Sequence, residues 1–382
     1  MPKSLSKSST YMLACLALVV SVGIPAGVPA ETIKSQRHDF RVTIIAKGLD
    51  HPWSMAFLPD GGLLITERVG RLRLFRDGTL LPKPVAGGPR VVDSGQGGLL
   101  DVILHPHFTE NKLLYLSYAA RGIGGVHTQV TRYRFDEAAH GLTEPKLIFD
   151  AIPKAGGGRH FGGRMAFDTT GHLYISVGDR GDKERAQKLA EHAGSVIRLK
   201  DDGGVPPDNP FFGRSDARPE IYSYGHRNPQ GMARHSRTGA IWTHEHGARG
   251  GDEINIIRKG RNYGWPVITH GIDYDGSPIG IGKSAPGMEQ PLYFWVPSIA
   301  PSGMAFYTGD KFSKWKNSLF VGALAGQALV RIELKGDKVI REERLLKGAV
   351  GRVRDVSTGP DGYLYIATDD DDGMVLRLEP VR

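Results

Sequence analysis

One sequence pattern recurs six times along most of the chain, and it constrains the fold more than any other feature. Each copy has an apolar stretch, a turn with Asp, Gly or Asn, and a second stretch rich in Leu, Ile, Tyr and Val. The copies cover residues 54–66, 99–116, 164–177, 231–243, 303–322 and 353–368. Several copies add a third apolar strand, as at residues 71–75, 329–332 and 374–378.

These repeats predict an all-β fold, a six-bladed β-propeller of four-stranded antiparallel sheets. No single repeat can bury both of its faces, so the repeats must stack around a common axis. The 51 glycines of the chain suit many tight turns between short strands. A β-sandwich with accidental internal similarity is the alternative, and six consecutive copies favour the propeller.

The first thirty residues lie outside this pattern. Lys3 and Lys7 precede an apolar stretch over residues 11–24, and small residues follow it. We interpret residues 1–30 as a secretory signal peptide and residues 31–382 as a single β-propeller domain. An uncleaved membrane anchor is disfavoured because the apolar stretch is shorter than the ~20 residues that a span needs. The sequence thus predicts an exported protein, periplasmic or secreted, with no stable membrane span.

Cysteine usage and charge exclude several classes of function. Cys15 is the one cysteine of the chain, and it lies within the predicted signal. A lipoprotein cleavage site at Cys15 is a weaker alternative. A mature chain without cysteine can form no disulfide, thiolate metal site or cysteine nucleophile. The net charge of +8 is spread along the sequence, whereas nucleic-acid binding calls for a clustered basic stripe.

A histidine and an aspartate flank the third repeat. His160 lies in the glycine-rich turn 156–164 before the first strand, and Asp179 follows the second strand. Because these strands are antiparallel neighbours, the loop entering one lies beside the loop leaving the other, so we expect the two side chains to meet. A histidine oriented by a carboxylate can act as a general base near neutral pH. A loop histidine bonded only to backbone is the alternative.

The fourth repeat is flanked by the polar segments 223–231 and 244–255. Glycine-rich backbone beside acidic side chains offers carbonyl and carboxylate oxygens, the ligands that calcium prefers. His244 and His246 raise the alternative of a zinc site. Their spacing gives two ligands on one side of a strand, and no third is evident.

Arginines begin the sixth repeat. Arg352 and Arg354 project to one side at strand spacing, and Arg227 could join them across the channel of a propeller. Three guanidinium groups facing one cavity suggest an anionic ligand with several carboxylates. Surface salt bridges are the alternative for any one of them.

The sequence also resembles a known family, the soluble pyrroloquinoline-quinone (PQQ)-dependent aldose sugar dehydrogenases, which are relatives of the soluble glucose dehydrogenases. The His-Arg-Asn-Pro-Gln-Gly and Gly-Asp-Glu-Ile-Asn blocks are its longest motifs. The motifs lie at residues 95–99, 159–164, 225–231, 251–255, 262–266 and 352–355. The resemblance stretches from His51 to the C-terminus, nearly the whole chain after the predicted signal, so it implies one catalytic propeller domain.

The resemblance implies roles for individual residues. His160 would take the proton of the sugar's anomeric hydroxyl while hydride passes to the quinone, which yields a lactone. Asp179 would orient His160, Gln96 would lie beside substrate and cofactor, and Tyr274 would contact the substrate. The external electron acceptor would be a separate molecule.

The same resemblance implies a set of PQQ and calcium ligands. The cofactor would be held by Arg227, Asn228, Arg352 and Arg354. One calcium would bind the carbonyl oxygens of Gly247 and Ala248 beside the quinone. A second, structural calcium would lie at Glu253 and Tyr263.

This chain departs from the glucose dehydrogenases at two positions. Ala325 lies in the fifth-blade loop that supplies a cofactor-binding lysine in those enzymes. Arg159 replaces an aspartate that contacts sugar in those enzymes. The resemblance therefore implies a broad aldose preference rather than glucose specificity.

Two other functions remain as alternatives. A calcium-dependent propeller lactonase or other hydrolase needs a metal and a base, but it gives the three arginines no role. A non-catalytic ligand-binding propeller leaves the pair of His160 and Asp179 without a function.

Overall fold

A computed structural model of the chain describes residue 1 and residues 31–381. The predicted signal peptide lies, apart from Met1, outside the described residues. The compact unit that begins at Glu31 contains six four-stranded antiparallel sheets. The predicted six-bladed propeller is therefore confirmed. No helix in the described part of the chain is long and apolar enough to cross a membrane.

The first three blades follow one another along the chain. Blade one contains β2 (Pro52–Phe57), β3 (Leu63–Glu67), β4 (Arg71–Arg76) and β5 (Thr79–Leu80). Blade two contains β6 (Leu99–Leu104), β7 (Leu113–Gly122), β8 (Gly125–Asp136) and β9 (Gly141–Asp150). Blade three contains β10 (Met165–Phe167), β11 (Leu173–Val177), β12 (Ser195–Leu199) and β13 (Ile221–Tyr224).

The remaining blades continue this order, and the last takes one strand from each end of the described fold. Blade four contains β14 (Pro229–Arg234), β15 (Ile241–Glu245), β16 (Asp252–Ile256) and β17 (Tyr293–Trp295). Blade five contains β18 (Pro301–Phe306), β19 (Leu319–Ala323), β20 (Ala328–Lys335) and β21 (Lys338–Leu345). Blade six contains β22 (Val353–Thr358), β23 (Leu364–Thr368), β24 (Gly373–Pro380) and β1 (Phe40–Leu49).

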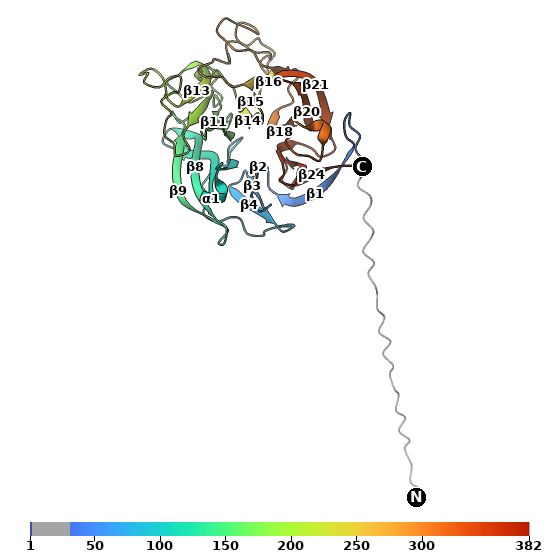
Figure 1. Cartoon of the computed structure of the whole chain (residues 1–382). Helices are drawn as coiled ribbons and strands as arrows, with labels where there is room; N and C mark the ends of the chain where they lie inside the picture. Colours follow the sequence, from blue (N-terminus) through green and yellow to red (C-terminus); the bar gives the residue numbers. More distant parts are fainter. Residues whose placement is uncertain (2–30, 382) are drawn as a thin grey trace. The chain divides into compact units, whose positions relative to one another are not determined.

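The sheets form a closed ring around an axis (Figure 1). The first strand of each blade contacts the first strand of the next, and β2 also contacts β22, which completes the circle. Pairing of β1 with β24, from Phe40 opposite Pro380 to Leu49 opposite Gly373, joins the two ends of the described fold. Three short helical turns, α1 (Phe108–Asn111), η1 (Lys183–Gln187) and η2 (Ser313–Trp315), lie in the connections.

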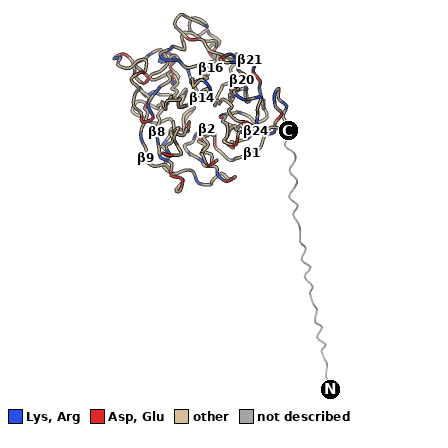
Figure 2. Tube along the Cα trace, viewed as in Figure 1, with Lys and Arg blue, Asp and Glu red and all other residues tan. Residues whose placement is uncertain are grey.

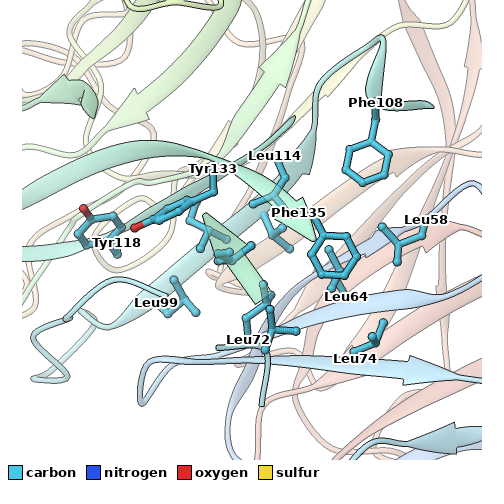
Figure 3. Packing of buried hydrophobic residues seen from close by; sticks show 14 of the residues in the cluster. Leu58, Leu64, Leu72, Leu74, Leu99, Phe108, Leu114, Tyr118, Tyr133 and Phe135 are labelled. Atoms are coloured by element: carbon cyan, nitrogen blue, oxygen red, sulfur yellow. The ribbon is translucent and has the colours of Figure 1, made fainter. Parts of the chain in front are cut away.

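The hydrophobic core lies between the blades. Figure 3 shows one such cluster, in which Leu72 and Leu74 of blade one pack against Leu99, Leu114 and Phe135 of blade two. All five side chains are buried. Because each sheet buries its faces against its neighbours, stability depends on the complete ring. Charged residues of both signs are distributed around the ring (Figure 2).

A buried ion cluster joins the inner strands across the axis. The Arg164 guanidinium donates to Asp101 of blade two at 3.2 Å and to Asp355 of blade six at 3.0 Å. It also lies 4.2 Å from the centre of the Trp53 ring. Burial raises the pKa of Asp355 to about 6, although Arg164 opposes the shift. Arg164 is the last residue of the glycine-rich turn 156–164, so the cluster anchors the loop that carries His160.

Candidate active site

The predicted contact between His160 and Asp179 is present. His160 Nδ1 lies 2.6 Å from Asp179 Oδ1. The backbone at His160 has φ of 52°, a left-handed conformation that is uncommon for a residue with a side chain. Gln96 fixes the loop, since its side-chain oxygen accepts a hydrogen bond from the His160 amide at 2.8 Å. The base loop is thus held by a neighbouring blade as well as by its own.

Asp179 is held in its ionised form. Burial would raise the pKa of Asp179, but its hydrogen bond to His160 and the charge of that ring outweigh burial and lower the pKa. Trp265 Nε1 donates to Asp179 Oδ2 at 2.8 Å, and the Gly181 amide donates to Oδ1 at 2.7 Å. An ionised carboxylate can only accept, so His160 Nδ1 carries a proton, and in the neutral ring Nε2 is the unprotonated nitrogen.

An open cavity of about 400 Å³ lies against this pair. Its lining includes His160, Arg159, Trp265 and Tyr274, together with Ala248. Tyr274 is largely exposed, and its hydroxyl lies 3.5 Å from Arg227 Nη2. The structure therefore brings the predicted base and the predicted substrate-contacting tyrosine to one cavity.

A second cavity, of about 240 Å³, carries the arginines of blade six. Arg352 and Arg354 both line it, and Gln96 lies on its wall. Asp369 accepts hydrogen bonds from both guanidinium groups, at 2.8 Å from Arg352 and 2.9 Å from Arg354. Burial would raise the pKa of Asp369, but the two arginines lower it well below its usual range. Asp369 was not among the residues predicted from the sequence.

Arg227 does not face the same cavity as Arg352 and Arg354, contrary to the arrangement considered from the sequence. Its Nη1 donates to the Gly247 carbonyl at 2.5 Å and to the His246 carbonyl at 3.3 Å. It lines the base cavity instead. The reason is local, because the loop after β15 places two carbonyl oxygens within hydrogen-bond distance of the Arg227 guanidinium. Its neighbour Asn228 accepts from the Gly162 amide at 3.2 Å.

The predicted metal ligands lie in two places. The Gly247 carbonyl is the partner of Arg227, and Ala248 lines the base cavity. Glu253 and Tyr263 line a small void that also borders Glu245. Burial and the nearby charge of Glu245 raise the pKa of Glu253 to about 8. The Tyr263 hydroxyl donates to the Ile256 carbonyl at 2.6 Å, which leaves its own carbonyl as the oxygen that a metal could use.

The histidines considered for zinc do not converge on a site. His244 is fully buried, and neither of its ring nitrogens has a hydrogen-bond partner among residues 31–381. His246 Nε2 donates to the Pro301 carbonyl at 2.5 Å. Burial lowers the pKa of His246 to about 3. No cluster of three His, Cys, Asp or Glu suited to a metal occurs in the described part of the chain.

The family described as "Glucose / Sorbosone dehydrogenase" matches residues 49–377. The chain belongs to this family. The resemblance seen in the motifs is therefore confirmed, and the chain is an oxidoreductase of a sugar dehydrogenase family.

Individual relatives agree with the family assignment. The aldose sugar dehydrogenase YliI of Escherichia coli (strain K12) is 47% identical over 343 residues, which cover 89% of this chain and 92% of that protein. The soluble aldose sugar dehydrogenase of Escherichia coli in its apo form superposes with a TM-score of 0.87 at 46% identity, covering 90% of this chain and all of that one. The PQQ-bound aldose sugar dehydrogenase of Streptomyces coelicolor has a TM-score of 0.74 at 30% identity, covering 89% and 98%.

Proposed function

We propose that this protein oxidises aldoses at the anomeric carbon to lactones, with PQQ as cofactor and an external electron acceptor. The carrying observation is the pair of His160 and Asp179 at a cavity open to substrate. The cavity of Arg352 and Arg354 suits an anionic cofactor, and Gln96 on its wall bonds the His160 amide. The relative solved with PQQ supports this choice of cofactor.

In this proposal, His160 is the general base. Its Nε2 accepts the proton of the anomeric hydroxyl, and Asp179 stabilises the imidazolium that forms. Loss of that proton makes the C1 hydrogen easier to remove as hydride, so base and hydride acceptor must face the same carbon. Tyr274 and Arg159 would contact the sugar from the rim of the cavity.

The residues present fit a tricarboxylate quinone. Arg354 Nε, Arg227 Nε and Asn228 Nδ2 are buried nitrogens without a hydrogen-bond partner in the described residues. Buried donors of this kind destabilise the fold unless a ligand accepts their hydrogen bonds. When bound, PQQ supplies the hydride acceptor, and calcium supplies a positive charge beside it.

The residues at the two predicted calcium positions differ in how well they suit a calcium ion. Glu245 is buried, and the partly buried Glu253 lies directly opposite it on the neighbouring strand. Burial and the charge of Glu245 raise the pKa of Glu253, so a cation beside the two carboxylates would be favourable. A calcium ion would supply that charge. At Gly247, a calcium ion would replace the Arg227 guanidinium as the partner of the carbonyl, because two cations on one oxygen repel. We propose that Arg227 turns toward the cofactor when that calcium binds.

The reaction is tested on a panel of aldoses with an artificial electron acceptor, with and without added PQQ. We expect acceptor reduction that requires PQQ and yields one lactone per two electrons, measured by chromatography of the product. Lactone hydrolysis without any acceptor would support the hydrolase alternative instead.

The metal is tested by removing bound ions with a chelator and then adding PQQ together with Ca²⁺, Mg²⁺ or Zn²⁺. Calcium should restore most activity, and restoration by zinc alone would contradict the proposal.

Export is tested separately. We propose that residues 1–30 are removed after secretion. Amino-terminal sequencing of the protein from the periplasm or medium should then begin at Glu31. A chain that starts at Met1 would contradict cleavage.

A further inference from the structure

Arg180, which directly follows Asp179, is a buried cation without a carboxylate partner. Its side chain is only 7% exposed. Among residues 31–381, its guanidinium donates to backbone carbonyls and to no acidic side chain. Burial lowers the pKa of Arg180 to about 10. A buried charge without a counter-ion costs stability, so its presence calls for another explanation.

The contacts of Arg180 surround the residue proposed as the base. Its Nη2 donates to the Gly157 carbonyl at 2.9 Å, and its Nη1 donates to the Arg159 carbonyl. The guanidinium carbon also lies 3.5 Å from the centre of the Phe161 ring. The contacts therefore fall on both sides of His160 in the sequence, and one side chain holds the loop before and after the base.

The loop needs such support for physical reasons. Three consecutive glycines, Gly156 to Gly158, precede Arg159, and glycine loses more backbone freedom on ordering than other residues. His160 itself adopts a left-handed conformation that is costly for a residue with a side chain. Arg180 shares this feature, with φ of 62°. Strain at two linked positions beside a candidate base persists only where surrounding contacts hold it.

We propose that Arg180 is a positioning residue, which holds the 156–161 loop so that His160 Nδ1 meets Asp179 and Nε2 faces the substrate cavity. This inference rests on the proposed function, because it assigns Arg180 to the alignment of the proposed base. Arg180 does not line the base cavity, so it acts through the loop and not by touching substrate.

The test uses a graded set of variants at one position. Arg180→Met removes both the hydrogen bonds and the charge, Arg180→Gln keeps a donor, and Arg180→Lys keeps the charge and a donor. Each retains a side chain at the same left-handed position, so backbone strain is matched. Arg198→Met is the control, because Arg198 is also 7% exposed and also lies over an aromatic ring, that of Tyr222, but outside the His160 loop.

We expect Arg180→Met to lower kcat about 10- to 100-fold at saturating PQQ and calcium, because displacement of a reacting group by about 1 Å costs on this order. KM for the aldose and the dissociation constant of PQQ, followed by its absorbance, should change less than about threefold. Arg180→Lys should recover part of kcat. Arg198→Met should lower the melting temperature and leave kcat within about twofold. A folded Arg180→Met protein with the kcat of the wild type would overturn the inference.

A double-mutant cycle separates this inference from the proposed function. If Arg180 acts through His160, Arg180→Met should not lower the residual rate of a His160→Ala protein any further. Equal losses in both backgrounds would overturn the positioning role. If His160→Ala alone keeps its rate, the proposed base is wrong, whatever Arg180 does. If Arg180→Met fails to fold, Arg180→Gln and Arg180→Lys are combined with His160→Ala in the same cycle to test the positioning role.

Discussion

Blades three and four carry the same device in different surroundings. In blade three, His160 Nδ1 lies 2.6 Å from the Asp179 carboxylate. In blade four, His226 Nδ1 lies 2.8 Å from Glu245 Oε1. The two pairs have the same separation of 19 residues in the sequence. In both, the histidine precedes the first strand of its blade, and the carboxylate ends the second strand or follows it closely.

The second ring nitrogen distinguishes them. His226 is fully buried, and its Nε2 lies 2.9 Å from the Ser223 hydroxyl. Its ring also stacks on Tyr263, with centroids 4.6 Å apart. His160 is 8% exposed, and its ring borders the 400 Å³ cavity. One histidine has both nitrogens satisfied, and the other keeps Nε2 available.

The comparison shows that a histidine–carboxylate pair is not by itself a catalytic signature. The fold supplies the pairing in either blade because it places the entry and exit loops side by side. The ability of the histidine to act as a base then depends on whether its Nε2 is already hydrogen-bonded within the protein. This difference supports the proposal that blade three is catalytic, and we infer that the pair of blade four supports its loop.

The largest expected effect comes from removing the open histidine. His160→Ala should lower kcat by about 10²- to 10⁴-fold, the usual range for loss of a general base. PQQ binding should be unchanged, since the arginines are intact. Steady-state turnover with an artificial acceptor and a PQQ titration measure the two effects. A variant with more than half the wild-type rate would show that the two pairs are functionally alike.

Blade six extends the comparison, because its carboxylate at the equivalent place pairs with arginines. Arg354→Leu removes a charge-assisted hydrogen bond to the proposed cofactor, worth about 1.5–3 kcal/mol. PQQ affinity should fall about 10- to 100-fold, whereas kcat at saturating cofactor should stay within a fewfold. Titration of cofactor-free protein, read by recovery of sugar oxidation, gives the dissociation constant. Unchanged affinity would exclude Arg354 from the cofactor site.

The closed histidine should matter for stability rather than turnover. His226→Ala leaves Glu245 and Ser223 without their buried partner, at a cost of about 1–3 kcal/mol. Urea denaturation measures this loss, and kcat of the folded variant should fall less than tenfold. A loss of turnover as large as that of His160→Ala, at unchanged stability, would reverse the assignment of the two blades.

The smallest effect concerns acid stability. The pKa of Asp179 is lowered in the folded protein, so its contribution to stability is present above its unfolded pKa of about 4. That contribution is lost as the pH falls through the folded pKa. In Asp179→Asn no carboxylate titrates, so the gap in unfolding free energy between wild type and variant should narrow from pH 5 to pH 3. A difference in unfolding free energy that stays constant from pH 5 to pH 3 would contradict the lowered pKa of Asp179.

Much of the fold and part of the site were accessible from the sequence. The six repeats predicted the six blades, and antiparallel neighbours predicted the contact of His160 with Asp179. The same logic could have found Asp369, because an acidic residue ends or follows the second strand in four blades. These residues are Glu67, Asp179, Glu245 and Asp369, and each bonds a basic side chain.

Other features carry no local signal. Trp265 and Asp179 are 86 positions apart in the sequence, so the residues around either one do not predict their contact. The orientation of Arg227 depends on which carbonyl oxygens come within reach after folding. The short strand β17 follows an irregular stretch, residues 257–292, that breaks the repeat. Arg180 is one arginine among many until its distances to Gly157 and Phe161 are known.

The pairing of β1 with β24 has a consequence for how the chain can be made. No amino-terminal fragment contains six complete blades, because the sixth blade needs β24, which ends at Pro380. Contacts this distant in sequence form late and slowly. A nascent chain would thus stay an open arc until its synthesis is nearly finished. A stop codon that removes only β24 should therefore leave β1 unpaired. We expect such a chain to be degraded rather than to fold into a shortened enzyme.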